Sequence, residues 1–117
     1  MLSLPLPRLI EYPKEKDVLY FECGDWLYRV ECIRPMRGSS APYTYLLSYH
    51  PEVPESMPKN PSVALYWKDV YRYRSLHAPD SLDAYTEAFE LIDADYRMGH
   101  DVGRTVSEKR TPARADR

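Results

Sequence analysis

Two strand-like segments, separated by Gly24-Asp25, constrain the fold of this chain more than any other feature. The segments are Val18–Cys23 and Trp26–Ile33, and both are rich in the β-branched and aromatic residues typical of strands. A two-residue Gly-X loop between such segments predicts a β-hairpin with a type II′ turn, because that turn needs a positive φ at its first central residue. The predicted register pairs Cys23 with Trp26, Phe21 with Tyr28 and Leu19 with Val30.

The period of two along a strand predicts two different faces for the hairpin. All six paired residues and Cys32 share one face, which is apolar enough for a core. The other face is semi-polar, with Tyr20, Glu22, Arg29 and Glu31 and, among them, Val18, Leu27 and Ile33. The two cysteines, Cys23 and Cys32, lie about six rungs apart in this register, roughly 20 Å at about 3.3 Å per residue. A disulfide needs Cα atoms within roughly 7 Å. We therefore expect free thiols with a structural role.

Two more strands are expected after the hairpin. Residues 43–49 are rich in tyrosine and leucine and predict a strand. Residues 63–74 also favour a strand, with Tyr and Arg on opposite faces. A helix over 63–76 is the alternative, because Asn60 as N-cap and Pro61 at the first helical position form a helix start signal. Between these segments, four prolines predict a stiff loop over residues 50–62.

The second clear element is a helix over residues 81–98. Asp80 is the expected N-cap, Asp83 suits the first turn, and Gly99 offers a C-cap. Apolar residues at 3,4,3,4 spacing predict one buried stripe, made of Leu82, Tyr85, Phe89, Ile92 and Tyr96.

These elements predict an α+β fold, because an apolar sheet face and an apolar helix stripe must cover each other. We expect a small antiparallel sheet of three to four strands (hairpin 18–33, strand 43–49, strand 63–74) with one C-terminal helix (81–98) packed on one face. Residues 1–17 form an N-terminal arm interrupted by three prolines, and residues 18–100 form a single domain. Residues 101–117 are charged with almost nothing apolar, which predicts a disordered tail.

Charge and hydropathy exclude several classes of protein. The net charge is −2, which argues against a whole surface built to grip nucleic acid. No apolar stretch approaches the roughly 20 residues of a membrane span. The N-terminus lacks a basic leader, and Pro5 and Pro7 interrupt its apolar part, so no signal peptide is expected. We therefore expect a cytoplasmic protein without membrane association.

Eleven tyrosines against two phenylalanines indicate a recognition surface, because tyrosine suits half-buried, half-wet positions. Asp83, Glu87 and Glu90 add an acidic face at i, i+4 and i+7 of the helix. The leading hypothesis is a non-catalytic protein-binding module, a small accessory or inhibitor protein of the kind that phages and mobile elements encode. Its expected binding residues are Tyr20, Tyr43, Tyr45, Tyr49, Tyr71, Tyr73, Asp83, Glu87 and Glu90. Pairing of a Tyr-rich edge strand with a second copy is a further alternative.

Two other functions compete with this hypothesis. The stretch Tyr66–Arg74 interleaves rings with cations and, with the basic tail, predicts a single-stranded nucleic-acid-binding protein. On a strand, however, those rings and cations would face opposite sides. The third alternative is a small enzyme that uses Cys23 or a histidine. The chain has no Gly-rich phosphate loop and no metal-ligand spacing, so neither cofactor nor metal is expected.

Overall fold

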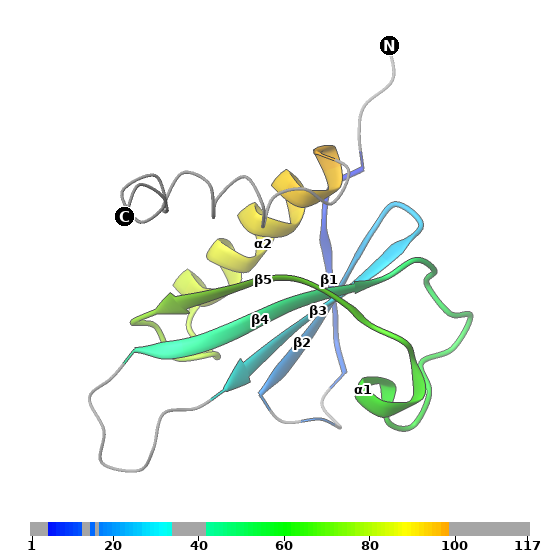
Figure 1. Cartoon of the computed structure of the whole chain (residues 1–117), viewed down its shortest axis with the longest axis horizontal. Helices are drawn as coiled ribbons and strands as arrows, with labels where there is room; N and C mark the ends of the chain where they lie inside the picture. Colours follow the sequence, from blue (N-terminus) through cyan, green and yellow to red (C-terminus); the bar gives the residue numbers. More distant parts are fainter. Residues whose placement is uncertain (1–4, 13–14, 16, 34–41, 99–117) are drawn as a thin grey trace, which may run out of the picture.

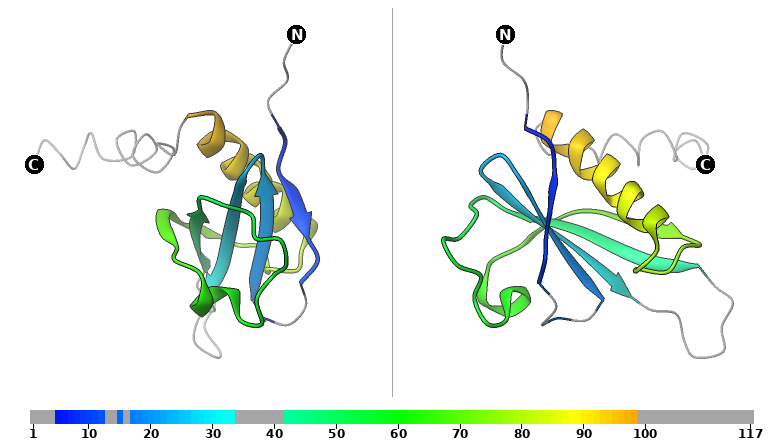
Figure 2. Two further views of the ribbon diagram at one scale, coloured as in Figure 1. Left: turned by 90° about the vertical axis from the view of Figure 1, so that its right-hand side faces the viewer. Right: turned by 180° about the vertical axis from the view of Figure 1, so that it is seen from behind.

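The computed structural model describes residues 5–12, 15, 17–33 and 42–98. A five-stranded antiparallel sheet in the order β1-β2-β3-β4-β5 carries helix α2 across one face (Figures 1 and 2). The elements are β1 Arg8–Ile10, β2 Val18–Cys23, β3 Trp26–Ile33, β4 Tyr43–His50, α1 Pro61–Ala64, β5 Lys68–Ser75 and α2 Leu82–Arg97. The α+β class is confirmed. The expected three to four strands and one helix are corrected to five strands and two helices.

The hairpin of β2 and β3 has the predicted register, with Cys23 opposite Trp26 and Phe21 opposite Tyr28. Gly24 has a φ of 63°, and Asp25 has no positive φ, as a type II′ turn requires. Gly24 also lies against the ring of Tyr96 in α2, where an added Cβ would come within 2.8 Å of Cζ. Both the turn and the packing therefore require glycine at position 24.

The first strand lies in the segment that the prolines marked as an arm. Residues Arg8–Ile10 pair with β2, and Leu9 lies opposite Phe21. Pro7 precedes this strand, and the next proline in the sequence is Pro13, so all three strand residues keep the N–H groups that a ladder needs. The prolines of this segment therefore do not prevent a strand.

Residues 63–76 contain parts of both structures that the sequence favoured. The start signal at Asn60 and Pro61 produces a single helical turn, in which the N–H of Ala64 donates to the carbonyl of Asn60 at 2.9 Å. The chain then extends, and β5 begins only at Lys68. A strand over 63–74 is therefore wrong in its first five residues, because the helix start signal prevails there over the β-branched and aromatic residues that follow it.

Helix α2 lies where it was expected, but its cap and its buried face differ. Ser81, not Asp80, is the N-cap, and its Oγ accepts a hydrogen bond from the N–H of Ala84 at 3.1 Å. The fully buried residues are Ala84, Ala88, Ile92 and Asp95. Of the predicted stripe, Ile92 is buried, Tyr96 packs against the core, and Tyr85 and Phe89 are half-buried. Leu82 is 77% exposed. The expected C-cap Gly99 and the tail 101–117 lie outside the described residues.

Large side chains already fill the sheet face beneath α2, which explains why alanines face it. Tyr28, Tyr45 and Tyr73 project from β3, β4 and β5 into the core, together with Phe21 and Leu47. A helix can approach such rings closely only with small residues. Cys23 and Cys32 belong to the same core and do not form a disulfide with each other. In the described part of the chain, no helix is long and apolar enough to cross a membrane.

Candidate functional site

The structure divides the predicted tyrosine surface into buried and half-buried members. Tyr45 and Tyr73 are buried under α2, and Tyr20 is 0% exposed on the opposite face. The expectation that Tyr20 lies on an open face is therefore wrong. Tyr43, Tyr49 and Tyr71 are half-buried on the α2 side of β4 and β5.

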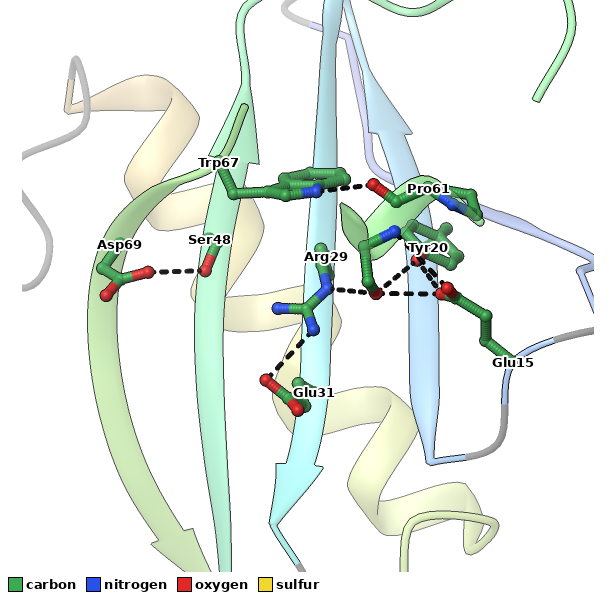
Figure 3. A network of polar contacts seen from close by, with 9 residues as sticks. Glu15, Tyr20, Arg29, Glu31, Ser48, Pro61, Trp67 and Asp69 are labelled. Carbon is green, nitrogen blue, oxygen red and sulfur yellow. Dashed lines mark hydrogen bonds and ion pairs between the residues drawn. The ribbon is translucent and has the colours of Figure 1, made fainter. Parts of the chain in front are cut away.

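Tyr20 is buried by the segment around α1, which is held to the sheet by a polar network (Figure 3). Ser62 of α1 lies at the centre of this network. Its Oγ accepts a hydrogen bond from Nε of Arg29 at 2.8 Å, donates to Glu15 at 2.9 Å, and lies 3.0 Å from the hydroxyl of Tyr20. Tyr20 itself donates to Glu15. Burial and this hydrogen bond to Glu15 raise the pKa of Tyr20.

Further contacts extend the network on both sides of Arg29. The guanidinium lies over the ring of Trp67 at 5.9 Å and pairs with Glu31 at 3.1 Å. The indole Nε1 of Trp67 donates to the carbonyl of Pro61 at 2.9 Å, and Tyr12 donates to the carbonyl of Lys59 at 2.8 Å. We call this arrangement the α1 latch, made of Tyr12, Glu15, Tyr20, Arg29, Ser62 and Trp67. Sequence reasoning missed it because its members come from four separate segments.

The three residues of the predicted acidic helix face also differ in exposure. Asp83 and Glu90 are exposed, and Asp83 pairs with His77 at 3.5 Å. Glu87 is half-buried, and its Oε1 is enclosed without a hydrogen-bond partner in the part of the chain that the structure describes. Burial, followed by the charge of Glu87, raises the pKa of Tyr73. The three carboxylates therefore do not form one exposed surface, because Glu87 is enclosed close to the sheet.

The free edge of β5 is the longest open strand edge in the described part of the chain. β5 has eight residues and ends the strand order, whereas β1 at the other edge has three. On one side of β5, Tyr71 and Tyr73 stack on each other at 6.1 Å and face α2. The opposite side carries Arg72 and Arg74, both exposed. An edge of this length presents a row of backbone donors and acceptors that a further strand could pair with.

This geometry disfavours the nucleic-acid alternative. The predicted separation of rings and cations is present, since Tyr71 and Tyr73 lie on the α2 side and Arg72 and Arg74 on the other. Trp67 contributes to the α1 latch. Tyr66, 73% exposed, is the only ring of the stretch Tyr66–Arg74 that stands largely in solvent. A surface on which bases stack while cations follow the phosphates is therefore not assembled here.

The described groups of the enzyme alternative, Cys23, His50 and His77, make structural contacts. Cys23 is buried, and its burial, followed by the nearby Asp93 and Asp95, raises the pKa of its thiol to about 11. A reactive cysteine has the opposite shift. Nδ1 of His50 lies 2.9 Å from the carbonyl oxygen of Tyr66, and His100 is outside the described residues. Within the described residues, no group of His, Cys, Asp and Glu could hold a metal ion.

A groove of about 600 Å³ lies at the β1 edge, between the start of α2 and the segment before β2. Its described lining residues are apolar, aromatic or acidic, and none of them is a serine, cysteine, histidine, lysine or arginine. Among the described residues, this lining offers neither a nucleophile with an adjacent base nor a cationic group for a developing negative charge. Comparisons with protein-family models, with curated proteins and with solved structures found no match. The function is therefore inferred from the chain's own geometry.

Proposed function

We propose that this protein is a non-catalytic protein-binding module, a small accessory or inhibitor protein that binds its partner along the free edge of β5. The observation that carries the proposal is the position of this strand. An eight-residue strand lies at the end of the sheet, and no strand of the described residues pairs with its outer side. Addition of a strand to such an edge is a recurrent mode of protein recognition.

The side chains around this edge support the same proposal. Tyr71 is half-buried beside the edge and packs against the core, and Tyr43 and Tyr49 accompany it on β4. Rings held in this way bind at a low cost in conformational entropy, because they are ordered before the partner arrives. Of the six tyrosines predicted as binding residues, this proposal therefore keeps three: Tyr71 on β5, and Tyr43 and Tyr49 on β4. Asp83 and Glu90 on α2 remain exposed for a secondary contact.

Site-specific photo-crosslinking in the native host tests this proposal. A photoreactive phenylalanine derivative replaces Tyr71 or Arg72 on β5, and as matched controls it replaces Glu52 or Lys59, which are exposed in the loop before α1. We expect one protein to be captured from both β5 positions and from neither control. That protein, once purified, must also bind the purified wild-type chain. Absence of any captured protein at β5, or equal capture at the control positions, overturns the proposal.

A further inference from the structure

We infer that the partner segment is an extended strand with acidic residues at alternating positions, which adds to the outer edge of β5 with those residues beside Arg72 and Arg74. The inference rests on the proposed function and specifies the chemistry of the partner. Its basis is that the free edge of β5 has a cationic side and an aromatic side, each with a different charge environment.

The cationic side carries two charges that the sheet does not neutralise. Arg72 and Arg74 are exposed, two residues apart, and therefore project from the same face. Their neighbours on β4 are Leu46 and Thr44, which carry no charge. None of the ion pairs found among the described residues uses either arginine. An added strand would place its side chains directly beside these cations, where opposite charges stabilise the pairing and like charges weaken it.

The aromatic side determines which residues of the partner strand are acidic. Tyr71 and Tyr73 face α2, and the carboxylate of Glu87 lies close enough to Tyr73 to raise its pKa further than burial alone. Oε1 of Glu87 is enclosed, and no described residue donates a hydrogen bond to it. Acidic residues on this side would be repelled by Glu87, whereas apolar or β-branched residues would extend the ring surface. The partner strand therefore alternates acidic residues on one side with apolar residues on the other.

The same charges disfavour pairing of β5 with a second copy. Antiparallel self-pairing centred on Arg72 or Arg74 places that arginine opposite its own copy, and centring on Tyr73 places Arg72 opposite Arg74. Each of these registers puts like charges in direct cross-strand contact, which is destabilising. Charged side chains protect natural sheet edges from self-association in this way. An acidic strand from another protein would instead be attracted to Arg72 and Arg74, because its charges are opposite to theirs.

Two matched peptides test the inference. Each has eight residues and carries fluorescein; one alternates glutamate with valine or threonine, and the other has lysine in place of every glutamate. Fluorescence anisotropy gives the dissociation constants for the wild-type chain and for the double variant Arg72→Glu/Arg74→Glu. We expect the glutamate peptide to bind the wild type below 1 mM and the double variant at least roughly tenfold more weakly. The double variant should bind the lysine peptide instead.

Controls separate the β5 edge from general electrostatics. Lys59→Glu changes an exposed cation in the loop before α1 and should leave the affinity for the glutamate peptide within about twofold. Backbone amide hydrogen exchange of the complex should show new protection in β5 and not in β1. Circular dichroism of each variant verifies that the sheet is retained. Affinity for the glutamate peptide should fall as the salt concentration rises.

Several outcomes would overturn the inference. These are absence of glutamate-peptide binding at 1 mM, equal affinity for the two peptides, or a β5-dependent dimer detected by light scattering. Binding of a fluorescent oligonucleotide that is lost in Arg72→Glu/Arg74→Glu, without peptide binding, would assign the edge to nucleic acid instead. A partner captured at β5 whose binding does not depend on Arg72 and Arg74 overturns this inference and leaves the proposed function standing. Absence of any captured protein overturns the proposed function itself.

Discussion

The hydroxyl of Tyr28 donates a hydrogen bond to Oδ2 of Asp95 across the core, at an oxygen–oxygen distance of 2.9 Å. Both residues are fully buried. Tyr28 lies in β3 and Asp95 in the last part of α2, so this bond joins the sheet to the end of the helix. A buried carboxylate is tolerated only when it is hydrogen-bonded, which makes this contact a determinant of how α2 lies on the sheet.

Removing the Tyr28 hydroxyl should therefore destabilise the fold more than removing an exposed one. We expect Tyr28→Phe to lower the free energy of unfolding by about 1.5–3 kcal/mol, because a hydrogen bond to a buried carboxylate is lost. Urea unfolding followed by circular dichroism measures this change. Tyr66→Phe is the matched control, since Tyr66 is exposed. A double-mutant cycle with Asp95→Ala should show coupling, and additive effects would contradict the prediction.

Gly24→Ala should destabilise the hairpin and displace the end of α2. The φ of 63° is unfavourable for alanine by about 1–2 kcal/mol, and the new Cβ would come within 2.8 Å of Cζ of Tyr96. We expect a lower unfolding free energy and a change in the near-ultraviolet spectrum of Trp26, whose ring lies 5.4 Å from that of Tyr96. Asp25→Ala, in the same turn, is the control. Equal stability of the two variants would contradict the prediction.

Alkaline titration should show a group of buried tyrosines that ionises late. Burial is the main cause that raises the pKa of Tyr20, Tyr28, Tyr45 and Tyr73 above the ordinary value of 10. Because the folded state holds these protons more tightly than the unfolded state, their contribution to stability is complete below pH 10 and is lost as the pH rises further. We expect these four tyrosines to ionise in a late step of the tyrosinate absorbance that coincides with unfolding.

The number of late-titrating groups gives the control for this titration. Tyr20→Phe should remove about one tyrosine from this late step, provided that the variant stays folded at neutral pH. Ionisation of these four tyrosines before unfolding would contradict the prediction.

The thiol of Cys23 should be unreactive in the native protein. Its pKa is raised from 9.0 to about 11, so its contribution to stability is complete below pH 9 and is lost towards pH 11. We expect iodoacetamide at pH 8 to alkylate it only after urea unfolding. Mass spectrometry of the digested protein identifies the modified cysteine. Rapid alkylation of Cys23 in the folded protein would contradict the burial seen here and favour the enzyme alternative.

Breaking the α1 latch should expose the proline-rich loop to proteolysis. Ser62→Ala removes the hydroxyl that joins Arg29, Glu15 and Tyr20, so α1 should leave the sheet more often. We expect trypsin to cleave after Lys59 several-fold faster than in the wild type. Ser56→Ala, an exposed serine in the same loop, is the matched control. Equal cleavage rates would show that the latch contributes little to holding the loop.

The predictions that rest on local sequence patterns agree with the structure. The hairpin register follows from a two-residue Gly-X turn and the period of two along a strand, and both are decided by neighbouring residues. The range of α2 follows in the same way from helical spacing and a polar cap. The start signal at Asn60 and Pro61 was also real, although it produces only one turn.

The predictions that the structure corrects depend on contacts between residues far apart in the chain. Helical spacing predicted that a stripe of large residues on α2 faces the sheet. Which side of α2 faces the sheet depends, however, on the tyrosine rings of β3, β4 and β5 that fill the core beneath it. Ala84 and Ala88 are buried beside these rings together with Ile92, and Tyr96 packs against the core near the end of the helix. The short β1 was missed because its stability comes from pairing with β2, and three residues carry almost no local signal.

The sequence by itself determined the hairpin, the presence of α2, the α+β class and the opposite placement of rings and arginines in residues 71–74, because each depends on local spacing and turn chemistry. The tertiary structure decided which tyrosines are buried and which strand keeps a free edge. Tyr20 is buried by Ser62, 42 positions away, and Tyr28 is bonded to Asp95, 67 positions away. Contacts over such separations depend on how whole layers pack, and no local pattern encodes them.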